Sequence, residues 1–166
     1  MDYKKFYNLE EYLFQDVGPR FRKTDTLSVE DFFCIVIWKA NRAKTKIKKK
    51  LSENTTLDES IKNLTNDLVQ AKGAKERLKI ITKEWKFGFP MATAILTVLY
   101  PEEFTVYDYR VRQQLGLSGV YNVKKYFNDF LPAVKKYAES RGETLRETDK
   151  ELWGKSFYDD LQKLIK

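Results

Sequence analysis

Apolar residues recur every three or four positions through most of this 166-residue chain, which is the spacing of one face of an α-helix. The first clear run follows Ser28-Val29-Glu30-Asp31, a pattern typical of a helix N-cap, and continues to about Leu51. Its apolar positions fall near one helical face: Phe33, Val36, Ile37, Ala40, Ala43, Ile47 and Leu51. We therefore expect one long amphipathic helix from Ser28 to Leu51.

The next segments predict two further helices and a tight turn. Thr56-Leu57-Asp58-Glu59 is a second capping pattern, and the helix that it opens should end near Lys72-Gly73. Its apolar residues keep helical spacing: Leu57, Ile61, Leu64, Leu68 and Val69. A third helix is expected from about Ala74 to Trp85.

The turn Lys86-Phe87-Gly88-Phe89-Pro90 separates this third helix from the apolar run Met91 to Tyr100. Proline is tolerated in the first turn of a helix, so the pattern predicts helix, tight turn, helix over about residues 74–100. Pro101-Glu102-Glu103-Phe104 breaks the second helix. Asp108 is then placed to cap a helix that reaches about Leu115-Gly116.

The last third of the chain is also helical by periodicity, over about residues 121–141 and 144–165. Thr144-Leu145-Arg146-Glu147 is a capping pattern, and Gly154 predicts a break in the final helix. No segment has the alternation of a strand, and no linker or internal repeat divides the chain. The sequence predicts a single all-α domain over residues 1–166, with roughly seven to nine helices.

Composition is that of a folded globular protein. Apolar residues make up 42% of the chain and aromatic residues 14%, which is too much for a disordered chain. No apolar run approaches the roughly 18 residues that a membrane span needs. Residues 1–11 are charged and lack a secretory pattern, so we expect a cytoplasmic protein with no membrane partner.

The chain contains no histidine, which narrows the chemistry that it can perform. Serine–histidine and cysteine–histidine nucleophile pairs, histidine–metal nuclease sites and the usual zinc clusters are excluded. The single cysteine, Cys34, lies in an apolar run and is expected to pack in the core. Any reaction must use carboxylates, lysines, tyrosines or a metal held by oxygen ligands.

Positive charge favours a polyanionic partner such as nucleic acid, although it can also serve solubility. Lysine and arginine number 31 against 24 acidic residues, which gives a net charge of +7. The densest basic run is Lys39, Arg42, Lys44, Lys46, Lys48, Lys49 and Lys50. On the predicted helix, positions 39, 42, 46, 49 and 50 share one face, which either follows a phosphate backbone or is a solvated surface.

The segment from Phe87 to Asp108, FGFPMATAILTVLYPEEFTVYD, carries the most informative pattern. A glycine-containing turn between two helices exposes backbone amides to a phosphate, and a carboxylate follows at the start of the next helix. Over about 25 to 30 residues this resembles the helix-hairpin-helix and aspartate of the HhH-GPD superfamily of DNA glycosylases. The resemblance implies that residues 86–90 grip duplex DNA and that a base is flipped into a pocket between two helical halves. It also implies that Asp108 assists cleavage of the glycosidic bond.

The chain departs from the family pattern at three places. The second hairpin glycine is replaced in Gly88-Phe89-Pro90, and Pro90 has no amide to donate to a phosphate. Pro90-Met91-Ala92-Thr93 lacks the lysine nucleophile of bifunctional members, which excludes Schiff-base chemistry from that position and leaves Lys86 or Lys39 as an alternative. A cysteine cluster for an iron–sulfur centre is also missing from the sequence.

What remains resembles a monofunctional enzyme, in which Asp108 orients a water or stabilises positive charge on the sugar. A plain helix N-cap is the alternative role for Asp108. The predicted DNA-contacting residues are Lys83, Lys86, Gly88, Arg110, Arg112, Lys39, Arg42 and Lys46. Aromatic side chains that can stack on a flipped base, or else belong to the core, are Trp38, Trp85, Trp153, Tyr107 and Tyr109.

The resemblance implies a DNA-repair hydrolase that acts on a damaged or modified base in duplex DNA, and we expect it to be a cytoplasmic, nucleoid-associated monomer. No cofactor is expected beyond a monovalent cation at the hairpin carbonyls. Two alternatives stay open. The first is a non-catalytic DNA-binding module of the same fold. The second is a helical protein-interaction domain whose hairpin resemblance is accidental.

Overall fold

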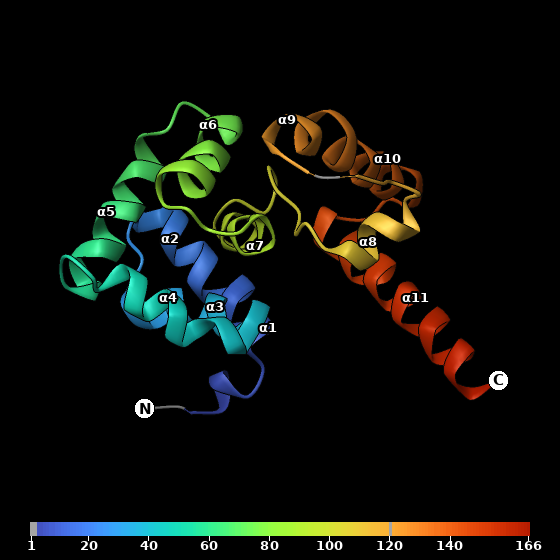
Figure 1. Ribbon diagram of the computed structural model, residues 1–166, viewed down its shortest axis with the longest axis horizontal. Coiled ribbons are helices and arrows are strands. Elements are labelled where there is room, and N and C mark those ends of the chain that lie inside the picture. Colours follow the sequence, from blue (N-terminus) through green and yellow to red (C-terminus); the bar gives the residue numbers. More distant parts are fainter. Residues whose placement is uncertain (1–2, 120) are drawn as a thin grey trace.

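The computed structural model describes residues 3–119 and 121–166, and all regular structure within these ranges is helical. The predicted all-α class is therefore confirmed. The helices form two groups that lie side by side (Figure 1). Helix α7 lies at the centre of the molecule, between α5 on one side and α8 and α10 on the other. No helix of the described residues is both long and apolar enough to cross a membrane.

The first group runs from the N-terminus to the end of α7 and contains the hairpin segment. Its elements are η1 (Lys4–Phe6), α1 (Leu9–Tyr12), η2 (Leu13–Val17), α2 (Gly18–Thr24), α3 (Val29–Ala40), η3 (Asn41–Ala43), α4 (Lys44–Leu51), α5 (Leu57–Gln70), α6 (Ala74–Lys79), η4 (Ile80–Glu84) and α7 (Phe89–Leu99). Helix α7 packs against α2, α3 and α6. Residues 91–99 are all buried, which is expected of a helix that is apolar on every side.

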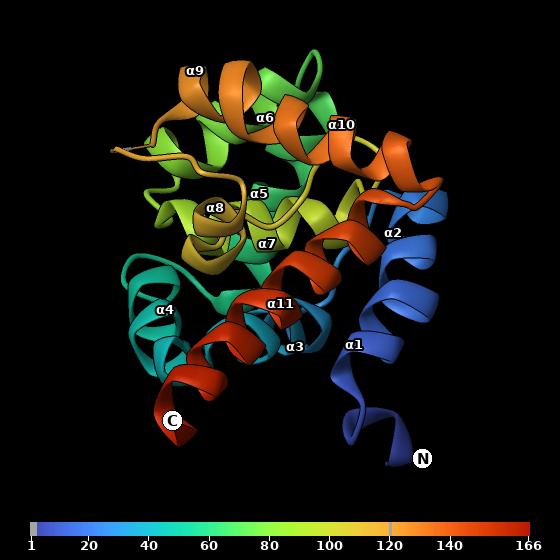
Figure 2. The same cartoon turned by 90° about the vertical axis from the view of Figure 1, so that its right-hand side faces the viewer.

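The second group contains α8 (Tyr109–Gln114), α9 (Val123–Lys125), η5 (Tyr126–Phe130), α10 (Leu131–Arg141) and α11 (Leu145–Ile165). Helix α11 packs on α8 and α10, and α9 contacts α6 of the first group. Viewed from the side of the second group, α11 crosses in front of α7 and α3 (Figure 2). The far end of α11 extends beyond the other helices of its group (Figure 1).

Four predicted helix starts are confirmed by their caps. The Ser28 side chain accepts from the amide of Asp31, at the start of α3. The Thr56 side chain accepts from the amide of Glu59, at the start of α5. Thr144 and Glu147 form a complete capping box ahead of α11. Asp108 caps α8, where its carboxylate accepts from the amide of Arg110 at 3.0 Å. In each case a side-chain oxygen satisfies one of the amides that the first helical turn leaves free.

The single helix expected from Ser28 to Leu51 is wrong. The chain leaves the helical region at Ala40, with φ −159° and ψ 85°, so that α3 and α4 are separate helices. Apolar spacing did not reveal the break, because Ala43, Ile47 and Leu51 keep a four-residue interval inside the second segment. The most buried side chains of α3 are Phe32, Ile35 and Val36, so its core face is rotated from the predicted one.

Two further differences concern the ends of the chain. Helix α11 continues through Gly154 without a break, because a single interior glycine costs a helix only about 1 kcal/mol. The helices α1 and α2 were not predicted, although Leu13, Val17 and Phe21 are buried at helical spacing. Of these two helices, α1 supplies Glu10 to the site described below.

Candidate functional site

The segment between α7 and α8 is held in place by hydrogen bonds to buried side chains. The hydroxyl of Tyr126 donates to the carbonyl of Thr105 at 2.7 Å and accepts from its amide at 3.0 Å. Burial raises the pKa of Tyr126, so its hydroxyl keeps the proton that it donates. The amide of Tyr107 donates to Thr93 Oγ1 of α7 at 2.9 Å. These contacts fix the position of Asp108, which directly follows.

Both carboxylate oxygens of Asp108 have partners. One oxygen accepts from the amide of Arg110, which is the capping contact. The other oxygen lies 2.9 Å from Nζ of Lys39, a residue of α3 in the first group of helices. Their side chains are 17% and 18% exposed, so the pair is largely shielded from water but still reachable from it. Asp108 therefore joins the two groups as well as capping α8.

A cavity of about 860 Å³ opens beside Asp108, between the two groups of helices. We refer to it as the interlobe cavity. Its lining residues come from α1, α3, η3, α8, α11 and the segment before α8: Glu10, Trp38, Lys39, Arg42, Val106, Asp108, Tyr109, Arg110, Arg146, Asp149, Lys150 and Trp153. Five of these side chains are cationic and three are carboxylates, so the lining has a net positive charge.

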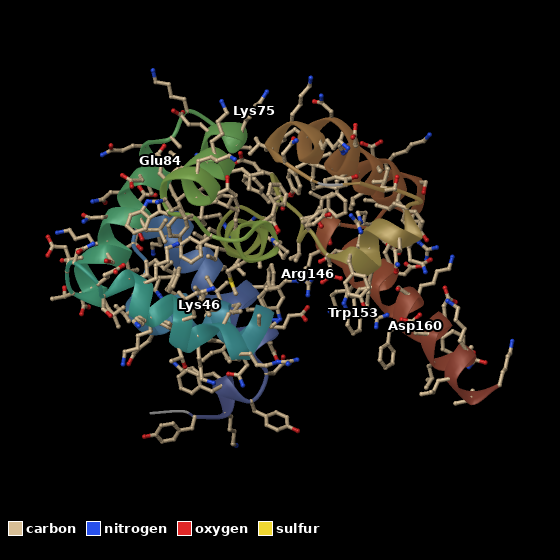
Figure 3. The ribbon with its side chains drawn as sticks, in the orientation of Figure 1. Lys46, Lys75, Glu84, Arg146, Trp153 and Asp160 are labelled. Carbon is tan, nitrogen blue, oxygen red and sulfur yellow. The ribbon has the colours of Figure 1, made fainter. Side chains whose placement is uncertain are left out.

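Arg146 lies at the start of α11 and points toward the first group (Figure 3). Its guanidinium contacts Glu10 of α1 at 3.1 Å and also pairs with Asp149. The same guanidinium lies 5.3 Å from the ring centre of Phe14 and 5.1 Å from that of Trp38. Cation–π contacts of this kind are strongest where water is excluded. Arg146 therefore bridges the two groups across the floor of the interlobe cavity.

Glu10 and Asp149 respond differently to their surroundings. Burial alone would raise the pKa of Glu10, but Arg146 and Lys150 lower it below its ordinary value. Burial raises the pKa of Asp149 to about 6, although Arg146 donates to its carboxylate and Lys39 acts in the same direction. Asp108 contributes to the increase as a nearby negative charge. The cavity thus contains a carboxyl group, that of Asp149, whose pKa lies above its ordinary value because of burial.

The hairpin turn does not depend on its glycine for backbone conformation. The left-handed residue of the turn is Lys86, with φ 51°, whereas Gly88 has φ −60° and ψ 145°. A Cβ built on Gly88 meets no atom within 4 Å. Gly88 is the N-cap residue of α7, and no side chain caps this helix end. The amides at the start of α7 are therefore not capped by a side chain, and the adjacent residue is a glycine.

A lysine ammonium contacts one of the hairpin carbonyls. Nζ of Lys50 donates to the carbonyl oxygen of Trp85 and lies 4.5 Å from the ring centre of Phe87. Burial lowers the pKa of Lys50, and the charge of Lys86 adds to this effect. Lys50 therefore belongs to the support of the turn, rather than to a basic surface.

The predicted DNA-contacting residues do not form one continuous surface. Lys39, Arg42 and Arg110 line the interlobe cavity, whereas Lys83 borders a separate shallow pocket together with Lys79 and Lys124. Lys46, Lys86 and Gly88 are exposed outside both pockets. The expected single basic face on one helix is wrong, because the break at Ala40 assigns Lys39 to α3 and the later lysines to α4.

Arg112 has a structural contact that the sequence did not indicate. Its guanidinium donates to the Tyr107 hydroxyl at 3.2 Å and to the carbonyl of Gly119 at 2.8 Å. Trp85 also has a local role, since its indole N–H donates to Asp67 at 2.8 Å. Of the aromatic candidates, Trp38, Trp153 and Tyr109 line the interlobe cavity.

Sequence reasoning missed four charged cavity residues: Glu10, Arg146, Asp149 and Lys150. Glu10 lies more than a hundred positions from Arg146, so no local spacing connects them. The useful signal was the spacing of three residues between Arg146 and Asp149, which places opposite charges side by side on the last predicted helix. A buried carboxylate needs a partner, which the neighbouring Arg146 provides.

Comparison of the chain with models of protein families, with curated proteins and with solved structures finds no match. The class of protein is described from its fold and its site. It is an all-helical protein with a largely cationic cavity between two groups of helices, and Asp108 is fixed at the wall of that cavity.

Proposed function

We propose that this protein is a DNA N-glycosylase, which hydrolyses the bond between deoxyribose and a damaged or modified base in duplex DNA. The supporting observation is the position of Asp108 in the interlobe cavity, with one oxygen on Lys39 and the other on the amide of Arg110. A carboxylate held by two donors keeps its orientation without reorganisation during a reaction. A cationic lining suits a polyanionic substrate.

In the proposed reaction the bond between C1′ and the base nitrogen breaks, and the base leaves with the bonding electrons. Positive charge then develops on the sugar, where the Asp108 carboxylate stabilises it and orients the attacking water. The oxygen of this water bonds to C1′, and its proton is released. The departing base takes up a proton from the cavity, and the products are the free base and an abasic site.

Duplex DNA is proposed to contact the hairpin side of the molecule as well as the interlobe cavity. The uncapped start of α7, at Gly88, can receive a phosphate, and the exposed Lys83 and Lys86 lie close in sequence to this helix end. Arg42 is exposed at the cavity and can contact a phosphate of the flipped nucleotide. Phosphate contacts position the duplex, whereas the cavity would select the base.

Release of base from labelled duplexes tests the proposal. The panel carries uracil, 8-oxoguanine, alkylated purines and phage-type modified bases, and alkali reveals abasic sites. Asp108→Asn keeps a good N-cap residue and removes only the charge, so we expect a folded protein whose rate falls at least about a hundredfold. Asp16→Asn changes an exposed aspartate outside the cavity and serves as the control.

Lys39 offers a second chemistry at the same site, because its ammonium lies 2.9 Å from Asp108. If its deprotonated amine attacks C1′, a Schiff base forms and borohydride reduces it to a stable covalent adduct. For the hydrolytic mechanism we expect base release without trapping in the wild-type protein. If the wild-type protein and Lys86→Gln are trapped on DNA by borohydride and Lys39→Gln is not, the reaction proceeds by lyase chemistry through Lys39 and not by hydrolysis.

A non-catalytic DNA-binding module is the second candidate function. It is favoured by the fact that both oxygens of Asp108 already have partners, which gives this residue a structural role without any reaction. In that case no duplex of the panel loses a base, whereas salt-sensitive binding to duplex DNA remains. Asp108→Asn would then leave every measurable activity unchanged, and the lost ion pair with Lys39 would affect only the stability of the protein.

A further inference from the structure

Two aromatic rings on α11 are exposed at the mouth of the interlobe cavity. Trp153 and Phe157 lie one helical turn apart, with ring centres 5.6 Å apart and ring planes inclined by only 7°. They are 43% and 49% exposed. Trp153 lines the cavity, and Figure 3 shows it on the part of α11 that follows Arg146. A parallel pair of this kind presents flat apolar surface to solvent.

Arg110 orders this pair from the neighbouring helix α8. Its guanidinium carbon lies 5.5 Å from the ring centre of Trp153, 5.8 Å from that of Phe157 and 5.3 Å from that of Tyr109. Asp160 of α11 accepts from the same guanidinium at 2.6 Å, and Ser156 lies 3.4 Å from it. The position of the Arg110 guanidinium beside the two rings is therefore fixed by its contacts with α11.

We infer that the surface formed by Trp153, Phe157, Tyr109 and Arg110 binds an unpaired nucleobase of a DNA strand that enters the interlobe cavity. Each base has an apolar face that stacks on an aromatic ring, and arginine adds a cation next to the stack. The adjoining cavity has more cationic than acidic side chains, which complements the phosphates on either side of such a base. We call these four residues the stacking surface.

The inference rests on the DNA-binding part of the proposed function and adds a feature of the substrate. A strand that delivers one nucleotide to Asp108 must leave the duplex locally, which unstacks the neighbouring base as well. Three residues of the stacking surface, Trp153, Tyr109 and Arg110, line the same cavity as Asp108, and Phe157 stacks on Trp153 beside it. The stacking surface can therefore replace the lost stacking partner of that neighbouring base. Single-stranded DNA should therefore bind to this surface without any lesion.

The test measures the affinity of the full chain for a fluorescein-labelled thymidine 12-mer and for a duplex of mixed sequence, by anisotropy. Phe157→Ala and Trp153→Ala are compared with Tyr7→Ala, which changes a ring that is 97% exposed away from the surface. A second control, Leu164→Ala, changes an 81% exposed apolar residue further along the same helix. Circular dichroism confirms that each variant is folded.

We expect Phe157→Ala and Trp153→Ala to weaken binding of the single strand about tenfold, while both controls bind as the wild type does. Single-strand affinity that is unchanged in both ring variants would overturn the inference. It would also be overturned if the wild-type chain self-associates through this face, so that Phe157→Ala and Leu164→Ala both abolish a dimer seen by light scattering.

Base release from the duplex panel separates the two proposals. If the stacking surface fails but the glycosylase proposal holds, the ring variants bind the single strand normally and Asp108→Asn alone loses base release. If the glycosylase proposal fails but the surface binds a base, no duplex releases base and the ring variants still lose single-strand affinity.

Discussion

Asp108 makes two contacts that have different structural roles. It caps α8 through the amide of Arg110, and it pairs with Lys39 of the other group of helices. The capping role was predicted from the sequence, because an aspartate before an amphipathic segment is a local pattern. The pairing with Lys39 was not predicted, since nothing in the spacing of residues 39 and 108 indicates that they meet. The residue with the clearest local signal thus also has a contact that only the tertiary structure reveals.

Asp149 is expected to make stability depend on pH. Burial raises its pKa from 3.8 to about 6, so the folded protein holds an extra proton between about pH 4 and pH 6. Stability from this residue is therefore present at low pH and is lost as the pH rises through the folded pKa. The difference in pKa corresponds to about 3 kcal/mol at most.

Asp149→Asn removes this titration. Urea denaturation at pH 4, 5, 6 and 7 should show the variant gaining stability relative to the wild type as the pH rises, because asparagine stays neutral throughout. The contact with Arg146 stabilises the ionised carboxylate of Asp149, so it already contributes to this pKa, which it lowers. A stability difference that is the same at all four pH values would contradict the assigned environment of Asp149.

At the level of elements, capping patterns predicted helix starts better than periodicity predicted helix ends. The caps at Thr56, Asp108 and Thr144 are all observed. The break at Ala40 was missed, because apolar spacing on its two sides is compatible with one helix. Local side-chain chemistry determines a cap, whereas a break between two packed helices depends on the core that surrounds them.

Substitution by alanine is expected to have opposite effects on stability at two glycines that lie in helices. A Cβ on Gly18 would lie 2.5 Å from the carbonyl oxygen of Val98 in α7, so Gly18→Ala should destabilise the protein by about 1–3 kcal/mol. Gly154 lies inside α11 and a Cβ there meets nothing within 4 Å, so Gly154→Ala should stabilise by about 0.5–1 kcal/mol. Thermal unfolding of both variants measures the two effects. Equal tolerance of alanine at both positions would contradict the close packing of α2 on α7.

At the scale of the whole molecule, three ion pairs cross between the two groups of helices. Lys39 pairs with Asp108, and Glu10 pairs with both Arg146 and Lys150. The all-α class followed from the sequence, because helical periodicity is present in every third of the chain. The division into two groups, and the cavity between them, did not follow from local patterns. Both depend on contacts between residues far apart in the chain.

Duplex binding is expected to depend steeply on salt, because the proposed contacts to phosphates release counterions. Arg42 is exposed at the interlobe cavity, so Arg42→Gln should lower the slope of log affinity against log salt concentration by about one. Lys62→Gln, an exposed change on α5, is the control. A slope near zero in the wild-type protein would argue against any DNA partner.

In the proposed function, Asp108 acts on the glycosidic bond of a base that is held in the interlobe cavity. The most direct test of this role is the release of base from the modified duplexes by the wild-type protein and by Asp108→Asn, with enzyme in excess over DNA. We expect at least one duplex to lose its base with the wild-type protein, and the folded variant to be at least about a hundredfold slower. Equal rates for the two proteins, or no release from any duplex, would contradict it.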